Sequence, residues 1–213
     1  MSEETKEIIS WIICIVIAVV LAILIRYFIG TQTIVKQESM FPTLYPNERL
    51  ILNRWFRTRN NVPERGDIVT FEAPSTSYIP IDDANLKNPV AKYEYEPSNI
   101  FLKFAYYVLE IGKNSFIKRV IGLPGDHIEI KDDKVYLNGE ELKEEYLQPS
   151  VKTRGDAYAF MDIVVPEGYV FVMGDNRDKS TDSRSFGCVP FEKLEGKVEF
   201  RIWPFSKWGS LYK

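Results

Sequence analysis

The sequence predicts a mostly β fold preceded by one N-terminal transmembrane helix. Apolar residues are concentrated in the first thirty positions or so, whereas the rest of the chain holds short runs rich in Val, Ile, Phe and Tyr, separated by turn residues. The length of 213 residues allows one compact domain together with an anchor or a large insertion. With 45% hydrophobic and 27% charged residues, the composition argues against disorder along the whole chain.

The predicted anchor comprises residues 8–29. No charged residue lies between Ile8 and Ile25. A helix over residues 8–29 would be roughly 33 Å long, which suffices for a hydrocarbon core about 30 Å thick. Trp11 near one end and Tyr27 and Phe28 near the other suit the two membrane interfaces. A cleaved signal peptide would have a shorter apolar core and a small-x-small site, and neither is present. The flanking basic residues do not decide the orientation.

The soluble part contains eight runs that we predict to be strands. Lys131–Asp133 and Asn138–Gly139 are predicted as turns, so that the segment around them forms hairpins. The predicted strands are residues 31–37, 49–53, 67–71, 115–122, 127–131, 134–139, 169–174 and 197–203.

Residues 99–112 differ from their surroundings because their apolar side chains repeat at helical spacing. Ser98 or Asn99 suits the start of this helix and Gly112 its end. We expect the helix to pack on the sheet. The alternative is an amphipathic helix in the membrane interface, with Lys103 and Lys113 near lipid headgroups. The preceding residues, 73–97, are predicted to form a surface loop.

Composition excludes several classes of function. A net charge of −3 and a pI near 5.4 give no support to nucleic-acid binding. One histidine and two cysteines almost exclude a zinc site built from several such residues, as well as a disulfide framework. No metal or cofactor is implied. Serine chemistry would have to use His127, the single histidine, or no histidine at all.

A lysine can replace histidine as the base that activates a serine if its pKa falls toward neutrality. Burial lowers a lysine pKa because it disfavours the ammonium form. Lys118 is the best candidate, since strand alternation places it on one face with Phe116 and Val120. From spacing alone, Lys118 could equally be an edge-strand lysine, and Ser39 a turn serine before Pro42.

Four motifs occur in order behind the anchor, at residues 37–44 (QESMFPTL), 65–69 (RGDIV), 117–126 (IKRVIGLPGD) and 174–187 (GDNRDKSTDSRSFG). Together they closely resemble the type I signal peptidases, membrane-anchored serine proteases that remove signal peptides from exported proteins. The resemblance covers the anchor and most of the chain from about Thr33 to Trp203.

The resemblance implies a role for each matching residue. Ser39 corresponds to the nucleophile and Lys118 to the general base, while Ser180 corresponds to a serine that hydrogen-bonds the lysine. Asp182 and Arg184 correspond to an acidic and a basic residue that support the site. The alternative interpretation is that the two residues form only an ordinary ion pair.

The oxyanion hole departs from the family pattern. It would use the Ser39 N–H and the residue two positions earlier, where the family usually has glycine or serine and this chain has Gln37. We expect the main chain or the side-chain amide of Gln37 to assist. Met40 and Ile117 are expected to line the shallow pockets that the family uses for small substrate residues.

The domain organisation follows from the same resemblance. We expect a cytoplasmic tail over residues 1–7 and the transmembrane helix over 8–29. A catalytic β core would comprise 30–127 and 167–213, with an insertion at 73–114. A smaller β-subdomain at 128–166 would be inserted into this core.

The implied partners are signal peptides of secreted preproteins and the lipid bilayer, with the secretion translocon nearby and no nucleic acid. The implied location is a bacterial plasma membrane, with a single span of the Gram-positive type and the catalytic domain on the extracytoplasmic side. Two alternatives stay open at this point. One is a non-proteolytic relative that assists the assembly of exported surface proteins, and the other is a self-cleaving Ser–Lys regulator.

Overall fold

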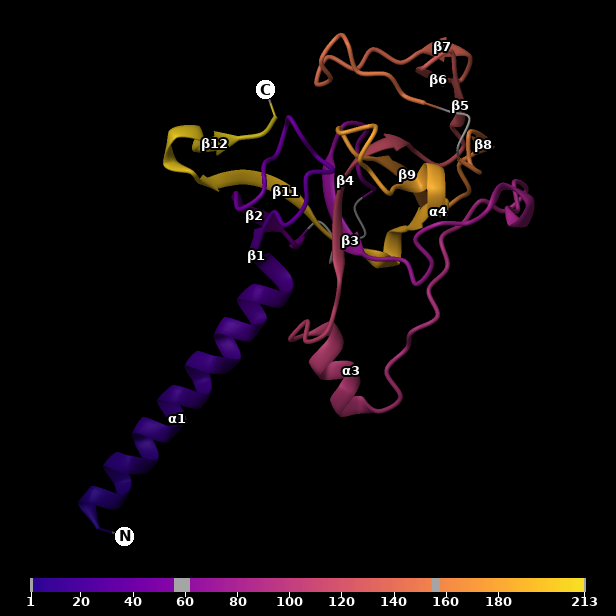
Figure 1. Ribbon diagram of the computed structural model, residues 1–213. Coiled ribbons are helices and arrows are strands. Elements are labelled where there is room, and N and C mark those ends of the chain that lie inside the picture. Colours follow the sequence, from indigo (N-terminus) through magenta and orange to yellow (C-terminus); the bar gives the residue numbers. More distant parts are fainter. Residues whose placement is uncertain (1, 56–61, 155–157, 213) are drawn as a thin grey trace.

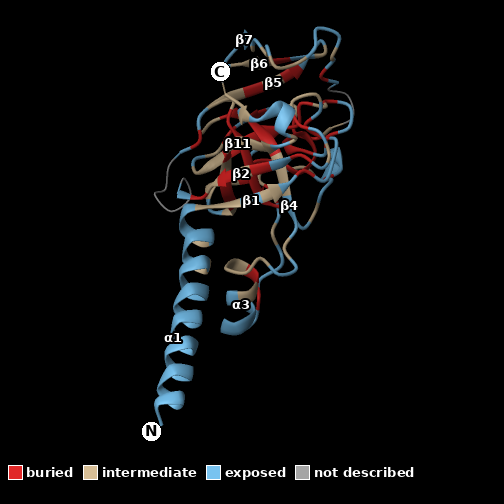
Figure 2. Cartoon of the chain, turned by 90° about the vertical axis from the view of Figure 1, so that its left-hand side faces the viewer, coloured by how far each residue is buried: buried red, intermediate tan, exposed pale blue. Residues whose placement is uncertain are grey.

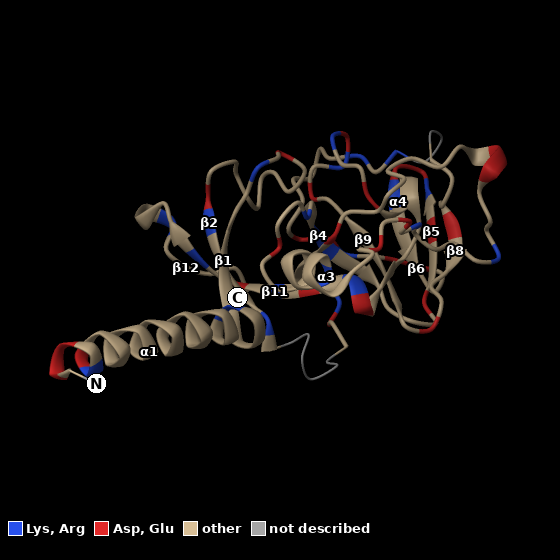
Figure 3. Ribbon diagram, turned by 90° about the horizontal axis from the view of Figure 1, so that it is seen from below, with Lys and Arg blue, Asp and Glu red and all other residues tan. Residues whose placement is uncertain are grey.

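A computed structural model describes residues 2–55, 62–154 and 158–212, and shows a long N-terminal helix that projects from a β-rich body (Figure 1). The helix α1 spans Glu3–Leu24 and continues as one π-helical turn, η1, over Ile25–Ile29. Along most of its length α1 carries no charged side chain (Figure 3), and none of its residues is buried. Within the described residues, this is the one helix long and apolar enough to cross a membrane.

Helix α1 begins at Glu3, earlier than the expected Ile8. The reason is local, because the Ser2 side chain accepts a hydrogen bond from the Thr5 N–H at 3.2 Å and caps the helix. Glu3 and Glu4 lie in the first turn, where negative charge is favourable at a helix N-terminus. The predicted end at Ile29 is confirmed.

The larger sheet is antiparallel and follows the order β1-β2-β11-β3-β4-β9-β10, with β12 paired to β11. It combines strands from both ends of the soluble part, so its centre brings together segments far apart in the sequence. Its strands are β1 (Gly30–Ile34), β2 (Arg49–Asn53), β3 (Ile68–Glu72), β4 (Ser115–Gly122), β9 (Tyr169–Met173), β10 (Val189–Pro190), β11 (Leu194–Trp203) and β12 (Gly209–Ser210).

The smaller sheet follows the order β7-β6-β5-β8 and is formed by the chain between β4 and β9. Its strands are β5 (His127–Lys131), β6 (Lys134–Leu137), β7 (Glu140–Glu141) and β8 (Asp162–Val164). Both predicted turns are confirmed. Asp132 and Asp133 have positive φ between β5 and β6, and so do Asn138 and Gly139 between β6 and β7. Two successive residues with positive φ are typical of tight hairpin turns.

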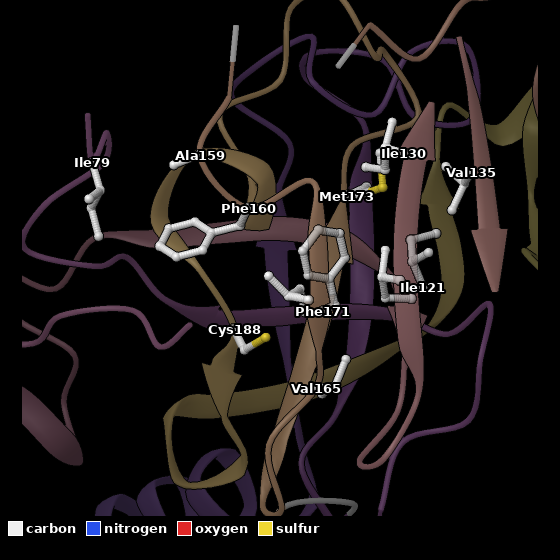
Figure 4. Packing of buried hydrophobic residues seen from close by; sticks show 12 residues of the cluster. Ile79, Ile121, Ile130, Val135, Ala159, Phe160, Val165, Phe171, Met173 and Cys188 are labelled. Carbon is white, nitrogen blue, oxygen red and sulfur yellow. The ribbon is translucent and has the colours of Figure 1, made fainter. Parts of the chain in front are cut away.

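The two sheets share one hydrophobic core. Phe171 and Met173 from the larger sheet pack with Ile130 and Val135 from the smaller one (Figure 4). Buried residues are concentrated in this body, whereas α1 is exposed along its length (Figure 2). The smaller sheet is therefore packed on the larger one and has no separate core of its own.

All eight predicted strands are confirmed, with end points that differ by a few residues. Four short strands, β7, β8, β10 and β12, were not predicted. Each has two or three residues, too few for an alternating pattern to be visible in the sequence.

Helix α3 spans Ile100–Tyr107, and Asn99 caps it by accepting a hydrogen bond from the Leu102 N–H at 2.9 Å. The prediction that this helix packs on the sheet is wrong. Ile100 and Phe101 are 76% and 83% exposed, and Tyr106 is its one buried residue. Figures 1 and 2 both place α3 outside the β body, level with the C-terminal half of α1.

The remaining helical elements are short: η2 (Ile81–Asp83), α4 (Ser183–Phe186), η3 (Phe191–Lys193) and η4 (Phe205–Lys207). The predicted loop at residues 73–97 contains η2 as its one helical turn.

Candidate active site

Ser39 and Lys118 meet at the centre of the larger sheet. Ser39 lies in the connection between β1 and β2, and Lys118 lies in the middle of β4. The Nζ of Lys118 donates a hydrogen bond to the Oγ of Ser39 at 2.7 Å and another to the carbonyl of Ile117 at 3.2 Å. The structure thus brings together the two side chains that the resemblance assigns as nucleophile and base.

Burial makes this amine unusual. The side chain of Lys118 is 1% exposed, and its Nζ lies 5.2 Å from the centre of the Phe116 ring. Desolvation lowers the pKa of Lys118 to about 8, although the charges of Asp182 and Asp175 act in the opposite direction. At pH 7 roughly a tenth of the amine is then neutral. A neutral amine at this distance can accept the proton of the Ser39 hydroxyl.

His127 lies elsewhere. It belongs to β5 of the smaller sheet, its side chain is 44% exposed, and its Nε2 is 2.7 Å from Oδ1 of Asp162. Because it is the one histidine in the chain, the basic group within reach of Ser39 is an amine and not an imidazole.

The segment Gly174–Arg177 fixes the backbone of Ser39. The N–H of Asn176 donates to the Ser39 carbonyl at 3.0 Å, and the Asn176 side-chain amide donates to the Glu38 carbonyl at 3.1 Å. Gly174 is packed so closely that an added Cβ would lie 2.2 Å from Ser180 Oγ and 2.4 Å from the Ser39 carbonyl oxygen. A side chain at position 174 therefore cannot fit without displacing Ser39.

Asp182 and Arg184 form a fully buried ion pair at the start of α4. Nε of Arg184 donates to one carboxylate oxygen at 2.8 Å, and its terminal nitrogen donates to the other at 2.9 Å. The second oxygen also accepts from the Gly174 N–H at 3.0 Å. Burial alone would raise the pKa of Asp182, but the Arg184 charge and these hydrogen bonds hold it below the usual value. The pair thus supports Gly174 and does not touch Ser39 directly.

Ser180 is brought to the same place, but the hydrogen bond expected from it is not formed. Its side chain is buried, and its Oγ has no hydrogen-bond partner within the described part of the chain. Lys118 donates instead to Ser39 and to Ile117. Ser180 therefore lies against Gly174 without a hydrogen bond to the lysine amine.

A cleft of about 550 Å³ opens beside Ser39. The cleft is lined by all four residues that the sequence analysis places in or near a substrate site, which are Gln37, Ser39, Met40 and Ile117. Gln37 is exposed, whereas Met40 is buried. The Ser39 N–H donates no hydrogen bond to any described residue.

The cleft is bordered by two strand edges. One edge belongs to β1, which pairs with β2 alone, and the other to the first half of β4, which pairs with β3 on one side. An extended peptide in this cleft would meet unpaired backbone groups on both sides.

Sequence reasoning did not identify two residues that hold the site together, Arg119 and Glu144, which pair with Asp175 and Arg177 of the 174–187 motif. Arg119 binds Asp175 through two hydrogen bonds of 2.8 and 2.7 Å, and Arg177 binds Glu144 from the smaller-sheet region. Arg119 left a detectable signal, since a charged residue in an apolar strand needs a buried partner. Glu144 left none, because its pairing with Arg177 arises from tertiary contact alone.

The chain is similar to known proteins of one family. The family model for signal peptidase, peptidase S26, matches residues 8–203. Signal peptidase IB of Staphylococcus aureus is 34% identical over 215 residues, which cover 95% of this chain and 93% of that protein.

Two further similarities are more partial. A probable signal peptidase I-1 of Synechocystis sp. is 34% identical over 196 residues, which cover 92% of this chain and 82% of its own length. The crystal structure of a signal peptidase I from Enterococcus faecalis is 28% identical and covers 63% of this chain and 95% of its own, with a TM-score of 0.39. From the family match along nearly the whole chain and the curated relatives, we conclude that this chain belongs to the signal peptidase family, peptidase S26.

Proposed function

We propose that this protein is a serine endopeptidase that cleaves signal peptides from preproteins, with Ser39 as nucleophile and Lys118 as general base. The observation that carries the proposal is the 2.7 Å hydrogen bond between the Ser39 hydroxyl and an almost fully buried lysine amine. The family supplies the reaction, hydrolysis of a peptide bond.

The chemistry follows from the protonation of Lys118. The neutral amine takes the hydroxyl proton while Ser39 Oγ attacks the substrate carbonyl, and a tetrahedral intermediate forms. The resulting ammonium then gives its proton to the departing amine as the peptide bond breaks. A water molecule, activated by the same lysine, hydrolyses the acyl-enzyme and restores Ser39.

The oxyanion of each tetrahedral intermediate needs a hydrogen-bond donor. Ser39 lines the cleft and its N–H has no partner within the described residues, so we propose the N–H for this role. Gln37 also lines the cleft, and its side-chain amide is exposed and able to reach a bound substrate. We propose it as the second donor.

Ser180, Asp182 and Arg184 act by positioning. Asp182 and Arg184 hold Gly174, whose close packing against Ser39 leaves no room for movement. Ser180 has a buried hydroxyl next to the pair, and we propose that it binds the lysine amine after the proton has left Ser39.

The substrate is an extended peptide with small residues at the first and third positions before the scissile bond. It would add as a strand along the two free edges of the cleft, a mode in which main-chain hydrogen bonds give affinity and pockets give selectivity. Met40 and Ile117 line the cleft and are proposed to shape these pockets.

The protein is membrane-anchored. Helix α1 is the candidate span, and we propose a single pass through a bacterial plasma membrane. Residues 1–7 would then be cytoplasmic. The β core formed by 30–127 and 167–213 would lie on the extracytoplasmic side, near the translocon that delivers the preproteins, together with the 73–114 insertion and the 128–166 subdomain. A non-proteolytic assembly partner is not favoured, because the relatives are peptidases.

The test is cleavage of a preprotein with an Ala-x-Ala site in detergent or lipid. Wild type should cleave it, and Ser39→Ala and Lys118→Ala should not, with folding intact. His127→Ala removes the one histidine, the alternative candidate for the general base. This control variant should keep full activity. An inactive, well-folded wild type would contradict the proposal, and Gln37→Gly would then show whether the substitution at that position had abolished the activity.

A further inference from the structure

Helix α3 presents an unusually apolar tip to its surroundings. Four large apolar side chains on its first two turns, those of Ile100, Phe101, Leu102 and Phe104, are between 46% and 83% exposed. Ile111, just beyond the helix, is 63% exposed. Exposed apolar surface of this kind is unfavourable in water, and its contiguity marks an interaction site.

The base of this segment is fixed firmly to the β body. The side chain of Lys113 is 6% exposed and pairs with Glu195 at 2.8 Å and with Glu72 at 3.6 Å. The buried hydroxyl of Tyr106 donates to Glu72 at 3.2 Å. The apolar tip is therefore held away from the core by a rigid base.

The same segment is tied to the end of the candidate membrane span. Glu110 forms an ion pair with Arg26 at 3.0 Å, at the C-terminal end of the α1–η1 helix, and a second pair with the buried Arg54. Burial would raise the pKa of Glu110, but the two arginines lower it and keep the carboxylate charged. Figures 1 and 2 show α3 projecting from the same end of the β body as α1, and Figure 3 shows few charged residues along either helix.

We propose that α3 is a second membrane-contact element, whose apolar tip lies in the interface of the same bilayer that α1 crosses. The bilayer is the occupant that the geometry favours, because Arg26 marks the end of the apolar span, Glu110 beyond α3 pairs with Arg26, and α3 projects from the β body at the same end as α1. Lys103, exposed on the same turn, can extend its amine toward headgroups. The inference rests on the proposed anchoring of α1.

Contact at α3 would set the height and tilt of the active site. Glu110, Lys113 and Asn114, which follow α3 directly, also line the cleft beside Ser39. One anchor leaves the β body free to rotate and tilt about the membrane normal, whereas two contact points joined by the Arg26–Glu110 pair restrict it. The cleft would then be held close to the membrane surface, where a membrane-bound preprotein presents its cleavage site.

The first experiment measures depth in the bilayer. The full chain is reconstituted into lipid vesicles and labelled with an environment-sensitive fluorophore at Cys14, at Phe101→Cys or at Ile81→Cys, the last two in a Cys14→Ala background. Cys14 is exposed on α1, and the buried Cys188 stays unlabelled. Ile81 is an exposed isoleucine of the same insertion, at 56%, but it lies near Ile79, whose N–H donates to the Ser185 carbonyl in α4.

We expect lipids that carry a quencher on the acyl chain to quench the probes at Cys14 and at Phe101→Cys, and not the probe at Ile81→Cys. Quenching at Cys14 without quenching at Phe101→Cys overturns the role of α3 and leaves the anchor intact. No quenching at Cys14 overturns the anchor and the inference together.

The second experiment measures the consequence for activity. Phe101→Asp should lower the rate of cleavage of a preprotein in vesicles several-fold, and leave cleavage of a short soluble peptide in detergent unchanged. Ile81→Asp is the matched control and should change neither rate. An equal loss in both assays would show that Phe101 acts through the fold or the site, and would overturn the proposal.

Discussion

Arg119 donates two hydrogen bonds to the carboxylate of Asp175, at 2.8 and 2.7 Å, and so connects the residue after Lys118 to the residue before Asn176. Asn176 in turn holds the Ser39 carbonyl, and Ser39 is bound to Lys118. These contacts form a closed ring through β4, the 174–177 segment and the turn after β1. The short distance between Ser39 and Lys118 is therefore a property of the ring and not of either side chain alone.

Breaking this ring at the ion pair should destabilise the protein. Asp175→Ala leaves the Arg119 guanidinium buried without its partner, which typically costs about 3–5 kcal/mol. Arg119→Lys should also lower stability, because an ammonium cannot form the two parallel hydrogen bonds. The measurement is the thermal unfolding midpoint in detergent. Glu141→Ala, which breaks an exposed pair with Lys134, is the control and should leave the midpoint unchanged. An equal shift for both variants would contradict the argument.

Gly174→Ala should abolish cleavage even though it adds one methyl group. The new Cβ would lie 2.2 Å from the Ser180 hydroxyl oxygen and 2.4 Å from the Ser39 carbonyl oxygen, so one of them must move. The nucleophile must then move away from Lys118, and a displacement of about 1 Å can cost on the order of 10²-fold in rate. Cleavage of the preprotein checks this. Gly139→Ala, at a hairpin turn of the smaller sheet, has open space around its Cβ and tests the effect of backbone strain alone. Full activity in Gly174→Ala would refute the tight packing.

The rate should rise with pH through about 8 and then level off. The Ser39 proton can pass to Lys118 only when the amine is neutral, and desolvation lowers the pKa of Lys118 to about 8. Below that pH, kcat/KM should fall about tenfold per pH unit. His127→Ala should leave this profile unchanged. A rising limb centred near the ordinary histidine pKa and lost in His127→Ala would exclude the mechanism.

The sequence predicted local features well and tertiary contacts less well. The anchor, the long strands and the 131–133 turn have patterns that neighbouring residues determine by themselves. Ser39 and Lys118 were identified from motifs that match a family. By contrast, the missing hydrogen bond between Ser180 and Lys118 and the pairing of Arg177 with Glu144 depend on contacts between distant segments. Helix α3 was assigned to the sheet because an apolar stripe looks the same whether protein or lipid covers it.

Gln37→Ala should lower kcat more than it raises KM. Its side chain is exposed on the cleft and is proposed to bind the oxyanion, a charge that is present in the transition state and absent from the bound substrate. Loss of one such donor typically costs about 10²–10³ in rate, and an exposed donor should lie at the lower end of that range. Steady-state kinetics on a peptide substrate distinguishes the two parameters. Lys36→Ala, an exposed neighbour that also lines the cleft, is the control. Unchanged turnover in Gln37→Ala would restrict the oxyanion hole to backbone groups.

Replacing Lys118 with methionine should abolish activity and yet stabilise the protein at neutral pH. The pKa of Lys118 is about 8 in the folded state and 10.5 in an unfolded chain, so folding at pH 7 requires an ammonium group to be buried. A difference of this size corresponds to roughly 3 kcal/mol. Because the folded pKa is the lower one, this cost is fully present below pH 8 and disappears as the pH rises toward 10.5.

The stability difference between Lys118→Met and wild type should therefore shrink by roughly 1 to 1.5 kcal/mol between pH 7 and pH 9. Other titrating groups, such as the buried Tyr93 and Tyr146, are common to both proteins and cancel in this difference. Denaturant unfolding in detergent at the two pH values measures it. A constant difference would mean that the Lys118 amine titrates alike in the folded and unfolded chains, and would remove the physical basis for a lysine base.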